Sequence, residues 1–123
     1  MSKAPAVLRL HGGRPSRARI LILTTIVFVY IIVYMKFEWD VAKNRENIEK
    51  HGLSFEDARL AFCDKNRLIE KDVKHSTSDE IRYFLYGDTG IGIATVRFTV
   101  RKDTIRIFGA GYWRQGRSKY ENR

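Results

Sequence analysis

The sequence contains almost no cysteine. Cys63 is the only one among 123 residues, which excludes an intrachain disulfide and a cysteine-rich metal site. The apolar neighbours Ala61 and Phe62 predict a buried, unreactive thiol. A chain without disulfides is typical of the cytoplasm, where thiols stay reduced. Because no other cluster of metal-ligating residues stands out, we expect neither a metal nor another cofactor.

Acidic residues are missing from the first 34 positions, which contain five Lys or Arg. The formal net charge of +9 therefore divides into +5 for this leader and +4 for residues 35–123. A surplus of positive charge suits an anionic partner, although a charge of this size is also ordinary for a small domain. Charge alone does not decide the function.

The leader also contains an uncharged run from Ile20 to Met35, ILILTTIVFVYIIVYM, which follows three arginines. A secretory signal has this pattern, but it needs small residues before its cleavage site, and Tyr34 and Met35 lead directly into Lys36. A membrane anchor is the second interpretation. At about 1.5 Å per residue, however, the run reaches only about 24 Å across a bilayer core of about 30 Å. The arginines would also push the domain out of the cytoplasm.

The interpretation that the sequence favours is that Met35 is the native initiator. Residues 1–34 would then be translated upstream sequence and would be excluded from the fold, and the protein would not associate with a membrane. A genuine membrane segment at residues 20–35 is the alternative. Residues 35–123 suit one small domain with a single core.

These residues predict an α+β domain with two N-terminal helices packed on an antiparallel sheet of about four to five strands, followed by a C-terminal helix. Asp40 and Gly52 have the positions of the N-cap and C′ residues of the first helix. Ser54 begins a capping box that opens the second, whose apolar face would be Phe55, Ala58 and Phe62. The expected order is strand 36–39, helix 40–51, helix from 54, strand 67–71, loop 72–79, strand 81–86, turn 87–90, strand 94–101, strand 104–108 and helix 112–120.

Two hairpin turns, at residues 87–90 and 102–103, fix the register that we expect between the last three strands. The resulting pairs are Arg82 with Thr95, Arg97 with Phe108 and Thr99 with Arg106. Arg82, Arg97 and Arg106 would then share one face, while the two helices cover the other. Such a cluster needs an anion or carboxylates nearby, and RNA phosphate is one candidate. The alternative is an ordinary solvated face with arginine stems over apolar surface.

Two histidines could transfer protons in RNA cleavage without a metal, in which the 2′-hydroxyl attacks the neighbouring phosphate. His75 lies in the polar loop, where it could act as acid or base, or simply hydrogen-bond the loop in place. His51 ends the first helix, where a cation also complements the helix dipole. The sequence favours this structural role for His51 and leaves both roles open for His75.

Three stretches resemble the BrnT-type toxins, which are ribonucleases of toxin–antitoxin pairs: MKFEWDVAKNRENIEKHGLSFEDA at 35–58, HSTSDEIRY at 75–83 and IRIFGAGYWRQGRSKYE at 105–121. The resemblance begins at Met35 and identifies residues 35–123 as a BrnT-like toxin domain. It implies a RelE-like fold, growth inhibition through metal-independent RNA cleavage, and neutralisation by a BrnA-like antitoxin. That antitoxin would be a ribbon-helix-helix protein, so the toxin would reach operator DNA only through it.

The resemblance also implies site residues. Lys43 ends a Trp-Asp-x-x-Lys motif that is similar to the family's; as a structural residue it would sit unfavourably against the helix dipole. Many relatives place arginines directly after the last strand, where this chain has Gly-Ala-Gly at 109–111, so Arg114 would act in their place. The predicted catalytic residues are Lys43, His75, Arg82 and Arg114, and the predicted RNA-binding residues are Arg97, Arg106, Arg117, Tyr112 and His51.

Two other functions stay open. In a non-catalytic nucleic-acid-binding or regulatory module, the same arginines would only grip phosphate. A membrane-tethered version of the domain would depend on residues 20–34.

Overall fold

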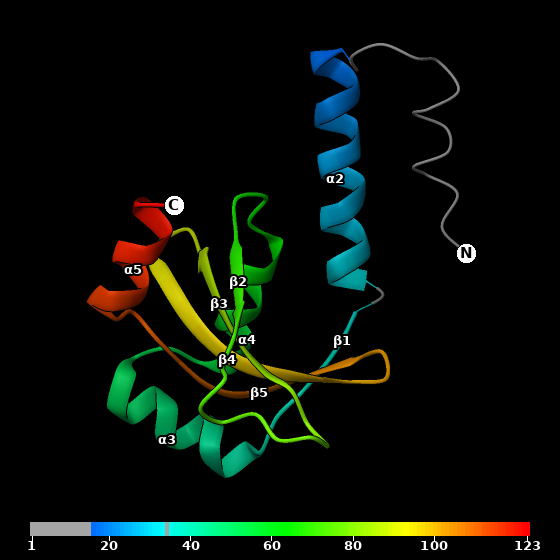
Figure 1. Ribbon diagram of the computed structural model, residues 1–123. Coiled ribbons are helices and arrows are strands. Elements are labelled where there is room, and N and C mark those ends of the chain that lie inside the picture. Colours follow the sequence, from blue (N-terminus) through cyan, green and yellow to red (C-terminus); the bar gives the residue numbers. More distant parts are fainter. Residues whose placement is uncertain (1–15, 34) are drawn as a thin grey trace.

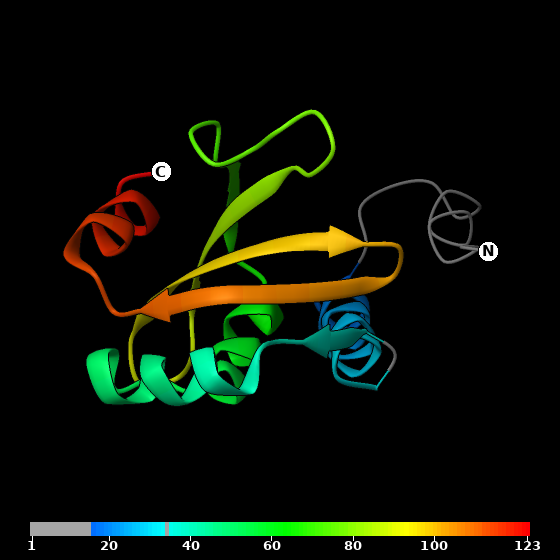
Figure 2. The ribbon, with the colours of Figure 1, turned by 90° about the horizontal axis from the view of Figure 1, so that it is seen from below.

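The computed structural model of the protein describes residues 16–33 and 35–123. Within these residues the strands form one five-stranded sheet in the order β1-β5-β4-β3-β2. Helices α3, α4 and η1 lie on one side of this sheet and α5 lies on the other (Figure 1 and Figure 2). The predicted α+β class is confirmed. The elements are α2 (Arg17–Val33), β1 (Lys36–Glu38), α3 (Val41–His51), α4 (Phe55–Ala58), the 3-10 helix η1 (Arg59–Cys63), β2 (Leu68–Lys71), β3 (Arg82–Asp88), β4 (Ile93–Arg101), β5 (Thr104–Gly111) and α5 (Arg114–Glu121).

Helix α2 contains most of the apolar run of the leader. It contacts η1 but otherwise stands away from the sheet (Figure 1). In the part of the chain that the structure describes, no helix combines the length and the apolar content needed to cross a membrane. Residues 1–15 and 34 of the predicted leader lie outside the described residues, and the start at Met35 stays a prediction of the sequence.

One apolar layer joins the sheet to the helices that cover it. Phe62 of η1 packs edge-on against Phe37 of β1 and Phe98 of β4, with ring centroids 5.2 and 5.0 Å apart. Phe55 and Ala58 are fully buried in the same cluster. The apolar face predicted for the second helix is therefore confirmed, and each buried phenylalanine contributes about 1.5–3 kcal/mol through removal of its ring from water.

The predicted starts of both N-terminal helices are confirmed. The Asp40 carboxylate accepts the N–H of Lys43 at 3.1 Å, and the Ser54 hydroxyl accepts the N–H of Asp57 at 3.0 Å. Gly52 ends α3 with a φ of 66°, in the left-handed region that favours glycine. The second helix is shorter than a regular α-helix, because after one turn it tightens into η1.

Cys63 ends η1 and is partly buried against the core. Burial raises the pKa of its thiol, and the charges of Arg67 and Arg59 oppose this only in part. A thiol with a raised pKa is a weak nucleophile at neutral pH. This agrees with the unreactive role that the sequence predicts.

The sheet is mixed, and not antiparallel throughout as predicted. β1 pairs with β5 in parallel, from Lys36 opposite Thr104 to Glu38 opposite Arg106, whereas the other three pairs of strands are antiparallel. The two strands are far apart in the chain. A local pattern of apolar residues does not specify the direction in which such distant strands pair, so the prediction holds only for β2 to β5.

The prediction of a turn at residues 87–90 is wrong. The turn instead runs from Thr89 to Gly92, where the N–H of Thr89 donates to the carbonyl of Gly92 at 2.9 Å. The first two residues of the predicted turn continue β3 as a regular strand.

Gly87 has a packing role that explains this error. A Cβ at this position would clash with the backbone of Ala61, so η1 can approach β3 closely only against glycine. Because the turn moves along the chain, Arg82 pairs with Thr99 and not with the predicted Thr95. A glycine that permits close approach of two elements has the same sequence signature as a turn glycine.

The second predicted hairpin is confirmed up to the pair formed by Thr99 and Arg106. Beyond this pair a β-bulge shifts the register, so Arg97 lies opposite Gly109 instead of the predicted Phe108. A bulge adds one residue to one strand and leaves the alternation on the other strand intact. The alternation of β4 therefore did not reveal it.

β5 is longer and α5 begins later than predicted, because β5 continues to Gly111. Asn47, a buried residue of α3, holds this last part of the strand. Its Nδ2 donates to the carbonyls of Leu53 and Ala110 at 2.8 Å each, and its Oδ1 accepts the N–H of Ala110 at 3.3 Å. The partner comes from a distant helix, so the local Gly-Ala-Gly composition wrongly indicated the end of the strand.

We predict that Asn47→Ala lowers the free energy of unfolding by about 2–4 kcal/mol, because it leaves buried backbone groups of Leu53 and Ala110 unpaired. Glu49→Ala, at an exposed position of the same helix, is the control and should change it by less than about 0.5 kcal/mol. Urea unfolding followed by circular dichroism measures both. Equal midpoints for the two variants would show that the bridge does not hold α3 to β5.

Several contacts of different kinds fix α5 to the rest of the domain. Gly116 is buried against β3 and β4, where a Cβ would clash with the hydroxyl of Thr95 and lie 2.9 Å from the Tyr86 ring. The Tyr120 hydroxyl donates to Oδ2 of Asp64 at 2.6 Å. Burial alone would raise the pKa of Asp64, but hydrogen bonds from Tyr120 and from two backbone N–H groups lower it below its ordinary value.

Because the pKa of Asp64 is lowered in the folded protein, we predict that the free energy of unfolding decreases at low pH. The unfolded chain binds a proton at Asp64 more readily, so the stabilisation is present above about pH 4 and is lost as the pH falls through the lower folded pKa. Tyr120→Phe should cost about 1 kcal/mol at neutral pH and should make the loss between about pH 5 and pH 2 shallower. Unfolding free energies measured across this range check it, and parallel curves for parent and variant would contradict it.

Candidate nucleic-acid interface

The face of the sheet opposite α3 and η1 carries arginines from three neighbouring strands. Arg82 of β3 lies opposite Thr99, which lies opposite Arg106 of β5, and Arg97 follows on the same face of β4. The predicted grouping of Arg82, Arg97 and Arg106 on one face is confirmed, although two of the predicted pairs differ. The first hairpin shifts by four residues, and an even shift keeps every side chain on its face. The bulge shifts the second pairing by one residue, but Arg97 keeps its face because the alternation along β4 is unbroken. We call these three residues and the surface between them the arginine face.

Two glutamates offset part of the charge of this face. Glu80 accepts hydrogen bonds from Arg101 Nη2 at 2.8 Å and from Arg82 Nε at 3.2 Å, and Glu38 accepts one from Arg106 Nη1 at 3.1 Å. The bonds from Arg101 and then Arg82 lower the pKa of Glu80 below its ordinary value. The carboxylates that an arginine cluster requires are thus supplied by the chain itself for two of the three arginines.

Arg97 differs from its two neighbours. Among residues 16–33 and 35–123, no carboxylate pairs with its guanidinium. The half-buried side chain lies over Gly109, where an added Cβ would be 3.6 Å from Nη1. Arg82, in contrast, also lies over the Phe108 ring, 4.1 Å from its centroid. A half-buried cation without a counter-charge attracts an anion, so Arg97 is the strongest candidate for a phosphate contact on this face.

His75 is held by a buried carboxylate. Asp72, which is 5% exposed, accepts the backbone N–H of His75 at 3.2 Å and lies 2.8 Å from its ring Nδ1. The Ser76 hydroxyl donates to the Asp72 carbonyl at 2.7 Å and accepts the N–H of Arg82 at 2.9 Å, which ties the loop to the start of β3. With Nδ1 engaged, Nε2 is the ring nitrogen available to a substrate. The sequence indicated His75 but not Asp72, whose only signal was its position three residues before the histidine.

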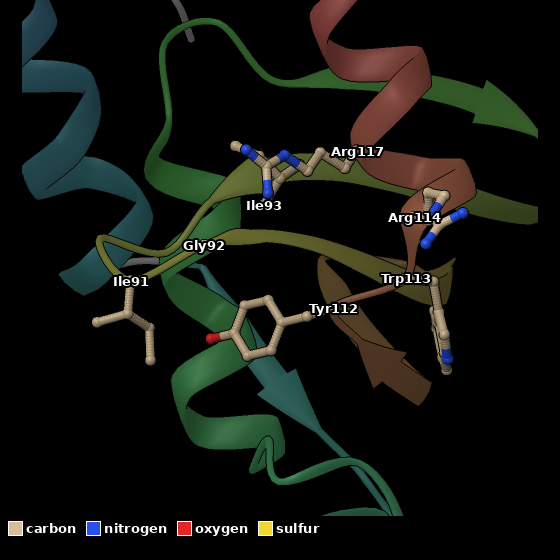
Figure 3. Close-up of a pocket in the computed structure, with 7 residues that line it drawn as sticks. All are labelled: Ile91, Gly92, Ile93, Tyr112, Trp113, Arg114 and Arg117. Atoms are coloured by element: carbon tan, nitrogen blue, oxygen red, sulfur yellow. The ribbon is translucent and has the colours of Figure 1, made fainter.

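A second group of predicted residues surrounds a pocket beside α5. Tyr112, Arg114 and Arg117 line it together with Trp113 and the β3–β4 turn, and it encloses about 340 Å³ (Figure 3). The Tyr112 hydroxyl is 2.9 Å from Oγ1 of Thr89, which fixes the ring beside the turn. Arg117 is paired with a carboxylate of its own helix at 3.0 Å. Arg114 has no such pair within the described part of the chain.

Lys43 and His51 belong to α3, on the other side of the sheet (Figure 2). His51, at the C-terminal end, packs edge-on against Trp113 with ring centroids 5.0 Å apart. Lys43 is exposed in the first turn and has no described contact with the arginine face. Trp113 was missed as a functional candidate although it joins several of the others. The predicted residues thus form two groups and one outlier: Arg82, Arg97, Arg106 and His75; Tyr112, Arg114, Arg117 and His51; and Lys43.

Residues 39–116 match the protein family described as ribonuclease toxin, BrnT, of type II toxin-antitoxin system. This match covers more than half of the chain. The chain belongs to the BrnT family. No curated protein matches the chain. The BrnT match includes every predicted site residue except Arg117, which lies directly beyond it.

Membership of the BrnT family implies an RNA substrate and an antitoxin partner, because the family consists of ribonuclease toxins of type II systems. The arginine face and the pair of Asp72 and His75 both suit an RNA-cleaving protein. A polyanionic substrate needs cations along its path, and the arginine face and α5 provide them. Cleavage needs a positioned proton carrier, and His75 is the described side chain that the structure orients in this way.

Proposed function

We propose that this BrnT-family protein is an endoribonuclease toxin that cleaves RNA on the arginine face. The observation that carries the proposal is the pair of Asp72 and His75 beside a row of arginines from three strands. Figure 2 shows the loop at 72–81 and α5 on one side of the β4–β5 hairpin, with α3 on the other. An RNA strand that follows this side meets His75, then Arg97, then α5.

The proposed reaction needs only groups of the protein, the RNA and a water molecule. The 2′-hydroxyl attacks the adjacent phosphorus while its proton passes to Nε2 of His75, and the bond to the 5′-oxygen breaks as that oxygen takes a proton from water. Asp72 holds Nδ1 and stabilises the imidazolium that forms. Arg97 and Arg82 stabilise the extra negative charge on the phosphate oxygens, which is usually the largest contribution to catalysis. The reaction is thus proposed to be independent of metal ions.

The proposed partner is a BrnA-like antitoxin in the cytoplasm. An acidic segment of the antitoxin that covers the arginine face would exclude RNA by direct competition, and the pairs formed by Glu80 and Glu38 are examples of the contacts that it would make. The complex would bind operator DNA through the antitoxin alone.

The second candidate function is binding of nucleic acid without cleavage. One observation favours it: Arg82 and Arg106 are already paired with Glu80 and Glu38, which leaves Arg97 as the unpaired cation of the described face. The two functions differ in what they require of His75, because a binding module has no need of a proton carrier.

We predict that His75→Ala reduces RNA cleavage about 100-fold or more, because it removes the proton carrier, and that RNA binding stays unchanged. Val73→Ala, in the same loop, is the control and should cleave like the parent. Inducible expression of the full chain, with growth and RNA integrity followed over time, supplements the assay with purified protein. Undiminished cleavage by His75→Ala would overturn the role of His75, and intact RNA with the parent would favour the binding module.

We also predict that Arg97→Ala weakens RNA binding by about 5-fold to 10-fold, because one phosphate contact is lost. The slope of the logarithm of the binding constant against the logarithm of the salt concentration should become smaller by about one. Lys43→Ala removes the same charge from the other side of the sheet and should change the affinity by less than about 2-fold, as for a surface charge away from the path. Titrations with 2′-O-methyl RNA at several salt concentrations measure both. A larger effect at Lys43 would place the RNA on the α3 side instead.

A further inference from the structure

A second pocket lies between α5 and the exposed side of the sheet and encloses about 200 Å³. Phe84 and Tyr86 of β3 line it with rings that are nearly parallel, at an interplanar angle of 14° and a centroid distance of 6.2 Å. Trp113 lines this pocket as well as the one in Figure 3, so the two adjoin. Three aromatic side chains therefore surround a space that the mechanism above does not use.

Polar groups at the rim of this pocket are of two kinds. Lys119 and the Tyr86 hydroxyl both donate to one oxygen of Glu70, at 2.6 and 2.7 Å, and these bonds lower the pKa of that carboxyl. Glu70 is thereby satisfied within the protein. The Gln115 amide, in contrast, has no hydrogen-bond partner in the described residues. It is free to bind a ligand, because an amide carries both a donor and an acceptor.

The pocket also borders the unpaired cation of the arginine face. Arg97 lies directly opposite Phe84 on the neighbouring strand. A ligand that places a flat ring against Phe84 therefore brings any phosphate attached to it toward Arg97. Lys119 is offset by its pair with Glu70, whereas the charge of Arg97 beside Phe84 has no such offset in the described residues and disfavours a cationic ligand.

We propose that this pocket binds one unpaired base of the RNA, an inference that rests on the proposed function and adds a site for base recognition to it. Its size suits a single flat group, because sites for drug-sized ligands enclose about 300–1,000 Å³. Unpaired bases stack on aromatic side chains, and their edges are read by amide and N–H groups. Phe84 and Trp113 supply the stacking surface, the buried Tyr86 ring supports Phe84 from below α5, and Gln115 supplies the donor and acceptor that distinguish one base from another.

The test uses the full chain and 2′-O-methyl RNA hexamers of each of the four bases, which bind but lack the hydroxyl needed for cleavage. The NMR signals of the two indole N–H groups report the position of binding. Trp113 lies in the pocket, whereas Trp39 packs edge-on against Phe55 in the core and serves as an internal reference. We expect the Trp113 signal to shift at a lower concentration of one hexamer than of the others, with the Trp39 signal unchanged.

Two pairs of variants test the contacts. Phe84→Leu should weaken binding of the preferred hexamer about tenfold through loss of stacking, whereas Phe84→Tyr keeps the ring and should bind within about twofold of the parent. Gln115→Ala, at an exposed position that does not endanger folding, should bring the affinities for the four hexamers together. Ser118→Ala on the same helix lies outside the pocket and should keep the preference.

A Trp113 signal that does not respond to RNA, or that responds only to the antitoxin, would overturn the base pocket. So would an unchanged base preference in Gln115→Ala. Cleavage of ordinary RNA is measured beside these titrations. RNA cleavage without a Trp113 response would support the ribonuclease activity and contradict the base pocket. A Trp113 response without cleavage would support the base pocket and contradict the ribonuclease activity.

Discussion

The packing of Phe62 against Phe37 and Phe98 decides which face of the sheet is buried, and the rest of the structure depends on that choice. These three rings come from η1, the edge strand β1 and the central strand β4, so they join elements from both ends of the domain. Once apolar contacts close this side, the alternation of side chains along the strands turns Arg82, Arg97 and Arg106 to the opposite side. The basic face is thus a consequence of the core.

Charge on that face is distributed unevenly. Glu80 and Glu38 pair with Arg82 and Arg106, whereas Arg97, two residues further along the strand between them, has no carboxylate partner in the described residues. The arginine face thus combines two arginines that the chain itself pairs with one whose charge it leaves uncompensated in the described residues. Helix α5 then covers the other end of the same side, where Gly116 lets it approach closely enough to form two aromatic pockets around Trp113.

The errors made from the sequence have physical causes that concern long-range contacts. Gly87 has the composition of a turn but serves the approach of η1, and this moved the first hairpin along the chain. The Gly-Ala-Gly segment at 109–111 has the composition of a strand end, but Asn47 holds it in β5. In both cases the deciding partner lies far away in sequence. The second hairpin, whose turn is local, was predicted correctly up to the bulge.

The sequence by itself determined the class of the fold, the caps at Asp40 and Ser54, the apolar face of the second helix and the membership of three arginines in one face. It could do so because capping depends on neighbouring residues and because side chains alternate along a strand whatever its register. Only the tertiary structure decided which arginine is unpaired, that Asp72 holds His75, and that Phe84, Tyr86 and Trp113 share a pocket. These relations join strands, a loop and a helix that the chain brings together only when it folds, so no local pattern contains them.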